Sequence, residues 1–361
     1  MKKFSVFAAL VSLVITSHSG AWASEDIIVK RRAAERFVTL PDGVRFPEGI
    51  TANPKTEEIY VGTFDGGPNS NKLLRYKKNG ELVAQRDFGG TPLLGLQFNR
   101  WDNKVYICNF GASKIQRIAA NFDAATDIED VASIPSIGPP ADRKVDNPDM
   151  SQDTIIFGSN NFPAPNALAF DKHGNLYISD SFQGAIFRID SAYKCATPCE
   201  VTKVKHDALL ATAGFPPFGA NGLALSKDES NLFIANTGDD RILRLNLKTG
   251  ELSIWAESID GVDGLASYKG VIVAAANQAD VVFILNENGR VIAKLGDFLG
   301  IRDDGSPRGL LFPASVVIVD DKIFVTNLAL PLTPAKGDEP EEDVTLYTVS
   351  RIDIPGHLPR Q

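Results

Sequence analysis

The chain has 361 residues, of which 43% are hydrophobic and 23% are charged, a balance typical of a globular protein with a sizeable core. Acidic residues outnumber basic ones by 45 to 37, which gives a formal net charge of −8. An acidic chain without a basic stripe is poorly suited to bind phosphate backbones, so the composition argues against a nucleic-acid partner. Four His and three Cys residues are too few to favour zinc, haem or iron–sulfur chemistry.

The first 23 residues have the features of a secretory signal peptide. Lys2 and Lys3 precede an apolar run over residues 4–15, and Ala21-Trp22-Ala23 supplies the small residues expected at a cleavage site. The apolar run is too short to span a bilayer, and no later run reaches the ~20 residues that a membrane helix needs. We therefore expect a mature chain of residues 24–361, periplasmic or secreted and without a membrane anchor.

A pattern of short strands recurs along the chain. It is clearest where PNALAF at 165–170 aligns with ANGLAL at 220–225, each followed by two further apolar runs. Apolar and polar residues alternate within the runs, and turn residues separate them, which predicts antiparallel strands. A fourth run follows in the second of these units, at residues 251–255.

Weaker copies of the unit fill the remainder of the mature chain. The first strands begin near six positions, spaced 46, 72, 55, 42 and 51 residues apart: Gly49, Gly95, Ala167, Gly222, Gly264 and Ser315. Units at this spacing are typical of propeller blades, so we predict an all-β fold, a single six-bladed β-propeller with four-stranded antiparallel blades. The last unit lacks a fourth strand, and the strand-like residues 36–40 are predicted to complete it and close the ring.

The residues just before these six positions are expected to surround the central channel, because the first strand of a propeller blade lies innermost. Four of the six carry side-chain oxygens, and the set is Glu48, Leu94, Asn166, Asn221, Asp263 and Ala314. Two carboxylates and two amides that converge on an axis favour a bound Ca²⁺, which prefers six to eight oxygen ligands. Asn-Gly and Asp-Gly are also common turn sequences, so the prediction depends on the four residues occupying the same position in their repeat units.

The oxygen-bearing positions carry a family resemblance. Glu in the first blade, Asn in the third and fourth, and Asp in the fifth resemble the calcium-dependent SMP-30/gluconolactonase/paraoxonase-like superfamily, which includes the squid-type diisopropyl fluorophosphatase. The resemblance covers essentially the whole mature chain. It implies a catalytic Ca²⁺ held by Glu48, Asn166, Asn221 and Asp263, and hydrolysis of a lactone or a related ester. A second, structural ion occurs in relatives and is left open.

Departures from the family pattern bear on the substrate. Paraoxonases carry a His where this chain has Leu94, so their proton shuttle does not transfer. Sugar lactonases carry an Arg where this chain has Ala164, which makes a less polar lactone or ester as good a candidate as an aldonolactone. As a group, strictosidine-synthase-like propellers do not use this set of four metal ligands, so its presence argues against a condensation reaction.

The expected chemistry is acyl transfer to water. The ion would stabilise the oxyanion of the tetrahedral intermediate, and Asp263 is the predicted catalytic residue, acting as general base or as nucleophile. A purely structural Ca²⁺, a propeller enzyme of another reaction class such as condensation, and a non-catalytic binding propeller are the alternatives. The sequence does not indicate an oligomeric state.

Long connections on the predicted metal face are candidate lids over a small-molecule site. They are residues 137–163, 213–218, 298–312 and 330–343, although the acidic run at 338–343 can equally be a solvated surface. Leu94 and Ala314 leave two sectors of the ring without ligands, and Phe215, Phe218 and Phe312 are candidate pocket walls or simple packing residues.

Cysteine spacing predicts one disulfide. Cys195 and Cys199 lie between the third and fourth strands of the third unit, and in an oxidising compartment a bridge is favoured over a metal site. Cys108 lies on an inner strand and is expected to be a buried thiol. No Gly-x-Ser-x-Gly motif supports a serine hydrolase.

Overall fold

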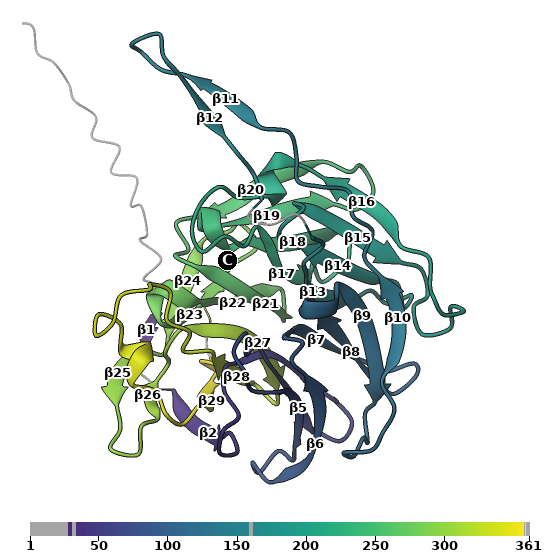
Figure 1. The fold of residues 1–361 in the computed structure, drawn as a ribbon, viewed down its shortest axis with the longest axis vertical. Helices are drawn as coiled ribbons and strands as arrows, with labels where there is room; N and C mark the ends of the chain where they lie inside the picture. Colours follow the sequence, from purple (N-terminus) through teal and green to yellow (C-terminus); the bar gives the residue numbers. More distant parts are fainter. Residues whose placement is uncertain (1–27, 31–33, 159–161, 357, 359–361) are drawn as a thin grey trace, which may run out of the picture.

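A computed structural model of the chain describes residues 28–30, 34–158, 162–356 and 358. The predicted signal peptide, residues 1–23, lies outside the described residues. Six sheets, each with four antiparallel blade strands and one with an additional outer strand, form a ring (Figure 1), which confirms the predicted six-bladed β-propeller.

Consecutive segments of the chain form consecutive blades. Blades 1 and 2 contain β3 (Pro47–Ala52), β4 (Ile59–Thr63), β5 (Asn71–Tyr76), β6 (Leu82–Gly89), β7 (Leu93–Asn99), β8 (Lys104–Asn109), β9 (Lys114–Ala119) and β10 (Glu129–Ser133). Blades 3 and 4 contain β13 (Pro165–Phe170), β14 (Leu176–Asp180), β15 (Ala185–Ile189), β16 (Thr202–His206), β17 (Ala220–Leu225), β18 (Asn231–Asn236), β19 (Arg241–Asn246) and β20 (Leu252–Glu257). Blades 5 and 6 contain β21 (Val262–Tyr268), β22 (Val271–Ala276), β23 (Val281–Leu285), β24 (Val291–Leu295), β27 (Pro313–Val319), β28 (Lys322–Asn327), β29 (Thr348–Asp353) and β2 (Glu35–Thr39).

The N-terminal strand β2 closes the ring, as predicted. It pairs antiparallel with β29, with Thr39 opposite Thr348, so the outer strand of blade 6 comes from the start of the chain. A shorter strand, β1 (Ile28–Lys30), runs parallel to β24 and extends blade 5, which the sequence pattern did not predict.

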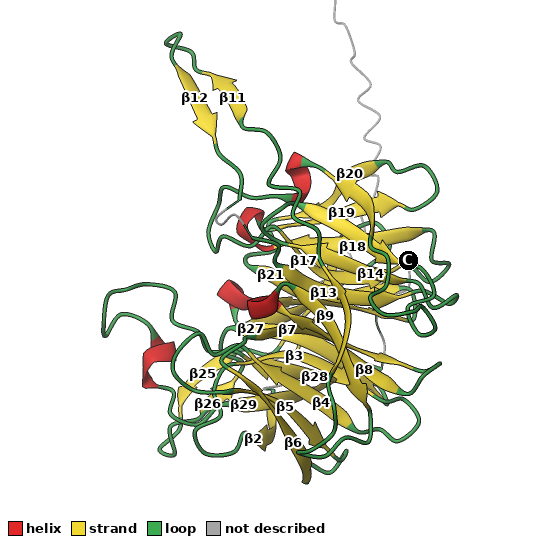
Figure 2. Ribbon diagram, turned by 45° about the vertical axis from the view of Figure 1, so that its right-hand side comes forward, coloured by secondary structure: helices red, strands yellow, loops and turns green. Residues whose placement is uncertain are grey.

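Elements outside the blades are short. Two hairpins, β11–β12 (Arg143–Asp146 and Gln152–Ile155) and β25–β26 (Phe298–Ile301 and Pro307–Gly309), lie in connections, and the first projects far beyond the ring (Figure 2). The described 3-10 helices are η1 (Phe110–Ala112), η2 (Ala208–Leu210), η3 (Thr237–Asp239), η4 (Asn277–Ala279) and η5 (Pro340–Asp343). None of these helices in the described part of the chain has the length and apolarity needed to cross a membrane.

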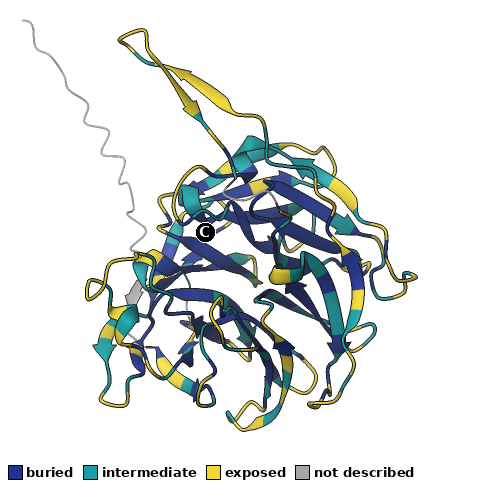
Figure 3. Ribbon diagram, viewed as in Figure 1, coloured by how far each residue is buried: buried dark blue, intermediate teal, exposed yellow. Residues whose placement is uncertain are grey.

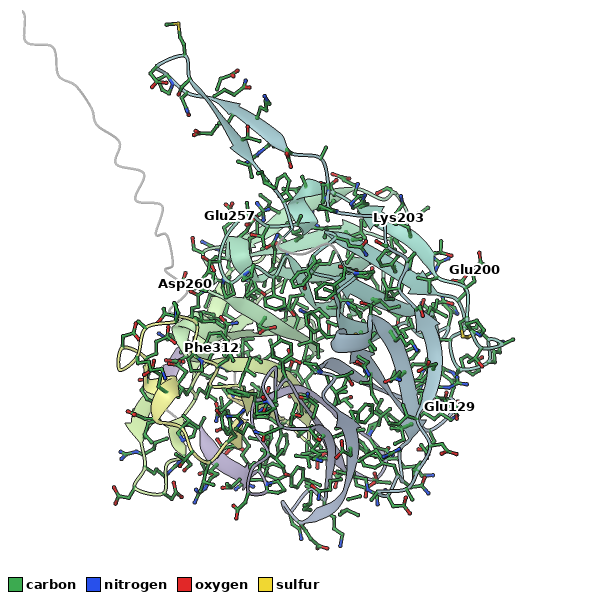
Figure 4. The ribbon with its side chains drawn as sticks, in the orientation of Figure 1. Glu129, Glu200, Lys203, Glu257, Asp260 and Phe312 are labelled. Atoms are coloured by element: carbon green, nitrogen blue, oxygen red, sulfur yellow. A yellow bond between two sulfur atoms is a disulfide. The ribbon has the colours of Figure 1, made fainter. Side chains whose placement is uncertain are left out.

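The hydrophobic core is divided among the contacts between blades. Six clusters of buried apolar side chains each combine strands of two adjacent blades; for example, Leu74 of blade 1 and Phe324 of blade 6 share one cluster. The innermost strands are buried, whereas the outer strands are partly exposed and the projecting hairpin is largely exposed (Figure 3). Charged residues of the fourth strands, such as Glu129 and Lys203, lie at the rim (Figure 4). Burial of apolar surface therefore stabilises the ring chiefly by joining each blade to its neighbours.

Each innermost strand has an irregularity at the same place. In blade 1 the pairing of β3 with β4 shifts between Pro47 and Ile50, so two residues of β3 lie between paired positions, and the other five blades repeat this shift. Such bulges redirect side chains at sheet edges and near binding sites. The residue at the first bulged position is in every blade the one that the sequence analysis placed around the channel.

The second bulged residue is small because neighbouring inner strands approach closely there. A Cβ atom built on Gly222 would lie 2.1 Å from the carbonyl oxygen of Asp263, and one on Gly49 would lie 2.2 Å from that of Leu94. Neither contact can be relieved by a side-chain rotation because the obstructing atoms belong to the backbone. The glycines that marked the repeat in the sequence are thus required by the close packing of the blades around the axis.

The predicted disulfide is present. Cys195 and Cys199 are bonded, with their Cα atoms 5.6 Å apart, in the connection between β15 and β16. Cys108 is a buried free thiol on β8, as predicted.

Candidate metal centre and pocket

The four predicted oxygen ligands line one pocket at the axis of the ring. Glu48, Asn166, Asn221 and Asp263 come from the inner strands of blades 1, 3, 4 and 5, and none of them is more than 5% exposed. The shared bulge brings residues far apart in the sequence to the same depth along the channel.

Hydroxyl groups orient the two asparagine amides. The Asn166 Nδ2 donates to Ser181 Oγ over 2.9 Å, and the Asn221 Nδ2 donates to Thr237 Oγ1 over 2.9 Å. Each hydroxyl in turn donates to a backbone carbonyl of the next blade, that of Ala220 for Ser181, over 2.7 Å. Because an amide is planar, fixing its nitrogen against a hydroxyl turns its oxygen away from that hydroxyl.

Three buried oxygens at this centre have no hydrogen-bond partner among the described residues. They are Oε2 of Glu48, Oδ1 of Asp263 and Oδ1 of Asn277. The Asn277 Nδ2 donates to Asp263 Oδ2 over 3.3 Å, so the amide and the carboxylate belong to one cluster. Unpartnered buried oxygens are costly and uncommon, and they require a group that accepts their lone pairs.

The two carboxylates destabilise each other when no cation is present. Burial raises the pKa of Glu48 well above its ordinary value, and the charge of Asp263 raises it further. Burial also raises the pKa of Asp263, while hydrogen bonds from Asn277 and Asn221 act in the opposite direction. A divalent cation would offset both the cost of burying the carboxylates and their mutual repulsion, because it neutralises the pair and supplies the missing partner of each oxygen.

The donor set suits a hard cation. The described residues contain no group of three or more His, Cys, Asp and Glu side chains that could bind a metal, so any ion at the axis must rely partly on amide oxygens. Two carboxylates with several amide oxygens are ligands that Ca²⁺ accepts, whereas zinc favours His and Cys. The residues present therefore fit Ca²⁺.

Asn277 was not predicted from the sequence. This residue follows β22 directly, in the position that Thr237 has after β18 and that Ser181 has after β14. Aligning the residues that follow each second strand would have revealed a second polar group in blades 3, 4 and 5. That signal is weak in the sequence because the position also holds Phe64, Phe110 and Leu328 in the other blades.

Apolar residues form the rest of the pocket lining. Of the predicted wall residues, Leu94, Phe218 and Phe312 line it. Ala314 is fully buried and Phe215 is 57% exposed, and neither is among the described lining residues. The lining also includes residues that the sequence analysis did not single out: Phe64, Pro216, Leu328, Leu330 and Leu332.

Three of the four predicted lids contribute to the pocket. Residues 213–218 supply Phe218, residues 298–312 supply Phe312, and residues 330–343 supply Leu330. The fourth lid does not cover the pocket, because none of its described residues is in the pocket lining and residues 143–155 pair with each other in the β11–β12 hairpin, which projects away from the ring (Figures 1 and 2).

Larger hollows lie at the opposite ends of the inner strands. One has a volume of about 420 Å³ and is lined by residues such as Gln97, Phe170 and Val317. None of the described residues that line it carries a buried oxygen without a partner. The size of a hollow therefore does not identify the functional site. The unpartnered buried oxygens of the axial pocket do.

Similar solved structures share the fold. A luciferin-regenerating enzyme is 15% identical with a TM-score of 0.60, covering 88% of this chain and 94% of that one. Regucalcin from Agrobacterium tumefaciens, a calcium-binding protein, is 14% identical with a TM-score of 0.59, covering 89% and 94%. A gluconolactonase from Xanthomonas campestris is 13% identical with a TM-score of 0.55, covering 87% and 88%. No protein-family model and no curated protein matches the sequence.

These comparisons confirm the predicted resemblance at the level of the fold. The chain is a six-bladed β-propeller of the kind found in regucalcin, gluconolactonase and luciferin-regenerating enzyme. At identities of 13–15%, the likeness does not extend to the activity.

Proposed function

We propose that the protein is a Ca²⁺-dependent hydrolase of lactones or related esters. The observation that carries the proposal is the cluster of unpartnered buried oxygens on Glu48, Asp263 and Asn277, in one pocket with the two oriented amides. The regucalcin structure described as calcium-binding and the gluconolactonase structure support the choice of ion and reaction.

Glu48, Asn166, Asn221 and Asp263 would hold the ion, and Asn277 lies against them. The charges of the two carboxylates match a divalent cation, while the amides contribute oxygens without adding charge. When bound, the ion supplies electrostatic stabilisation of the negative charge that develops on the substrate carbonyl oxygen.

Asp263 is the proposed catalytic residue. In hydrolysis, a bond forms between the water oxygen and the acyl carbon, the acyl carbon–oxygen bond of the ester breaks, and a proton moves from the water to the leaving alkoxide. Asp263 would either accept the water proton as a general base or attack the acyl carbon and be released by water. Its hydrogen bond from Asn277 orients one carboxylate oxygen, and the other has no hydrogen-bond partner among the described residues.

We further propose that residues 24–361 form the mature propeller and act in the periplasm or outside the cell. The Cys195–Cys199 disulfide is compatible with this location, because such bonds persist in oxidising compartments.

Calorimetry and hydrolysis assays test the proposal. We expect the purified protein to bind Ca²⁺, to hydrolyse members of a lactone and ester panel, and to lose that activity when a chelator is added. Asp263→Asn should lower kcat by about 100-fold or more while the circular dichroism spectrum stays unchanged.

Two results would contradict the proposal in different ways. Absence of Ca²⁺ binding would remove the metal site itself. Ca²⁺ binding without hydrolysis of any lactone or ester would favour a structural ion, and then a condensing enzyme or a non-catalytic propeller.

A further inference from the structure

The pocket has a polar half and an apolar half. All of its polar lining side chains belong to the cluster around the axis, on blades 1, 3, 4 and 5. The other described lining residues carry only carbon beyond the backbone, and we call six of them the apolar wall: Phe64, Phe218, Phe312, Leu328, Leu330 and Leu332. Five of the six pack in one cluster, and Phe218 is joined to Phe64 through the ring of Phe110.

Most polar groups of the cluster already have a hydrogen-bond partner or are proposed ligands of the ion. The nitrogens of Asn166, Asn221 and Asn277 donate to Ser181, Thr237 and Asp263, respectively. The Thr237 hydroxyl, which accepts from Asn221, also donates to the carbonyl oxygen of Val262 over 2.7 Å. Of the oxygens without partners, Oε2 of Glu48 and Oδ1 of Asp263 belong to proposed ligands of the cation, and Oδ1 of Asn277 remains as an acceptor.

A polyhydroxylated substrate would therefore lose its water and gain few partners in this pocket. Each substrate hydroxyl that enters would need a donor or acceptor, and the apolar wall offers none. Unpaired polar groups are strongly disfavoured in buried sites, and enzymes reject substrates on this basis.

Aromatic packing extends the apolar surface beyond the pocket. Phe218 lies 5.5 Å from Phe182 between ring centroids and 6.4 Å from Phe110. Phe162, which is 38% exposed, lies 5.2 Å from Phe182 and continues the cluster outwards. This aromatic cluster, on the loops before blades 3 and 4 and the turns of blades 2 and 3, places apolar side chains from Phe218 in the pocket lining to Phe162 at the surface.

From this division we infer that the enzyme acts on lactones with an alkyl substituent and not on sugar lactones. The inference rests on the proposed hydrolase function and adds the substrate class. The acyl group would lie at the polar cluster, and the alkyl chain would lie against the apolar wall.

Four lactones with the same six-membered ring test the inference: glucono-δ-lactone, δ-valerolactone, δ-decalactone and δ-dodecalactone. We expect kcat/KM with saturating Ca²⁺ to rise from δ-valerolactone to δ-decalactone by at least tenfold, because each buried methylene contributes about fourfold. Glucono-δ-lactone should be the poorest of the four.

Matched variants test whether the preference for a longer alkyl chain arises at the apolar wall. Phe218→Ser should reduce the preference for δ-decalactone over δ-valerolactone by about tenfold, whereas Phe215→Ser should leave it unchanged, because Phe215 lies on the same loop but is 57% exposed and outside the lining. Leu332→Ser provides a second variant of the wall on a different, partly exposed loop, in case Phe218→Ser does not fold.

The outcomes separate the two proposals. If glucono-δ-lactone is the best substrate, or if chain length has no effect, the alkyl-lactone inference is wrong and the hydrolase proposal stands. If none of the four lactones is hydrolysed, the alkyl-lactone inference is wrong, and the ester panel and Ca²⁺ calorimetry then decide the hydrolase proposal.

Discussion

Glu48 and Asp263 are two like charges that the fold buries together. The pKa of each is raised, which means that the folded protein without a cation is destabilised by their ionised forms. A binding site that costs stability when empty is typical of functional clusters, because the same arrangement stabilises the bound ion.

Replacing Glu48 with Gln should therefore have opposite effects with and without Ca²⁺. In chelator, Glu48→Gln should raise the melting temperature by about 2–5 °C, because it removes one of the two buried charges. With Ca²⁺, the variant should melt below the wild type and bind the ion about 30-fold or more weakly. Differential scanning calorimetry and titration calorimetry measure both effects.

Glu200→Gln is the matched control, because Glu200 is exposed at the periphery of the ring (Figure 4). This variant should change neither the melting temperature in chelator nor the one measured with Ca²⁺. If Glu48→Gln destabilises the protein equally in chelator and in Ca²⁺, the charge repulsion that we infer is absent.

Thr237 acts on the centre through Asn221. Thr237→Val removes both the acceptor for the Asn221 amide and the donor to the Val262 carbonyl, in a side chain that is only 1% exposed. We expect a loss of stability of about 1–3 kcal/mol and a Ca²⁺ affinity about tenfold weaker, because the amide oxygen is no longer oriented.

Thr237→Ser keeps the hydroxyl and should restore most of the Ca²⁺ affinity. Thr202→Val, on an exposed outer strand, makes the same chemical change without touching the site. A Thr237→Val variant with unchanged Ca²⁺ affinity would show that the hydroxyl has only a structural role.

At the level of the elements, the connection after β22 links the pocket wall to blade 5. Asp280 Oδ1 accepts a hydrogen bond from the backbone N–H of Phe312 over 2.8 Å. Burial raises the pKa of Asp280 to about 6, the hydrogen bond from Phe312 opposes this shift, and the charge of Asp297 adds to it. Asp280 also contributes to raising the pKa of Glu341 to about 7, after the larger effect of burial.

These shifts predict how stability depends on pH. Because the Asp280 pKa is higher in the folded chain than in the unfolded chain, the folded state binds more protons between pH 4 and 6, and stability falls as pH rises through that window. Asp280→Asn keeps the acceptor for Phe312 and removes the charge. We expect the variant to melt about 1–3 °C above the wild type at pH 8 and at the same temperature at pH 4, both measured with Ca²⁺.

Glu81→Gln, an exposed replacement in an i,i+4 ion pair with Lys77, serves as the comparison for loss of one negative charge. A gain for Asp280→Asn that persists unchanged at pH 4 would exclude the titration as its cause.

For the whole molecule, the sequence was informative where structure depends on local pattern. The alternation within strands and the recurring glycines predicted the blades, the inner position of Glu48 and its three companions, and the closure by residues 36–40. These features are local because a strand shows its buried face every second residue and a bulge needs a small residue.

The remaining features depend on contacts between distant segments. Phe215 and Phe218 are the same type of residue and share a loop, yet Phe215 is exposed and Phe218 lines the pocket. The path of residues 137–158 and the pairing of β1 with β24 likewise depend on tertiary contacts that no local pattern carries. Asn277 was overlooked because the corresponding position is apolar in half of the blades.

Ring closure can be tested by shortening the chain. A chain that begins at Pro41 lacks β2, so the N–H and C=O groups of β29 that pair with it lose their partners, and Val38 and Leu40 leave the cluster between blades 1 and 6. An open propeller exposes a strand edge and part of its core. We expect a fall in melting temperature of more than about 10 °C, with aggregation visible in size-exclusion chromatography.

A chain that begins at Ala34 is the comparison, because it lacks β1 but keeps β2. It should retain most of the stability, since β1 only extends the outer edge of blade 5. A synthetic peptide of residues 34–40 should partly restore the shorter chain by pairing with β29, in the antiparallel register that places Thr39 opposite Thr348. If the chain beginning at Pro41 melts at the temperature of the chain beginning at Ala34, the contacts between blades hold the ring without its closing strand, and β2 is dispensable.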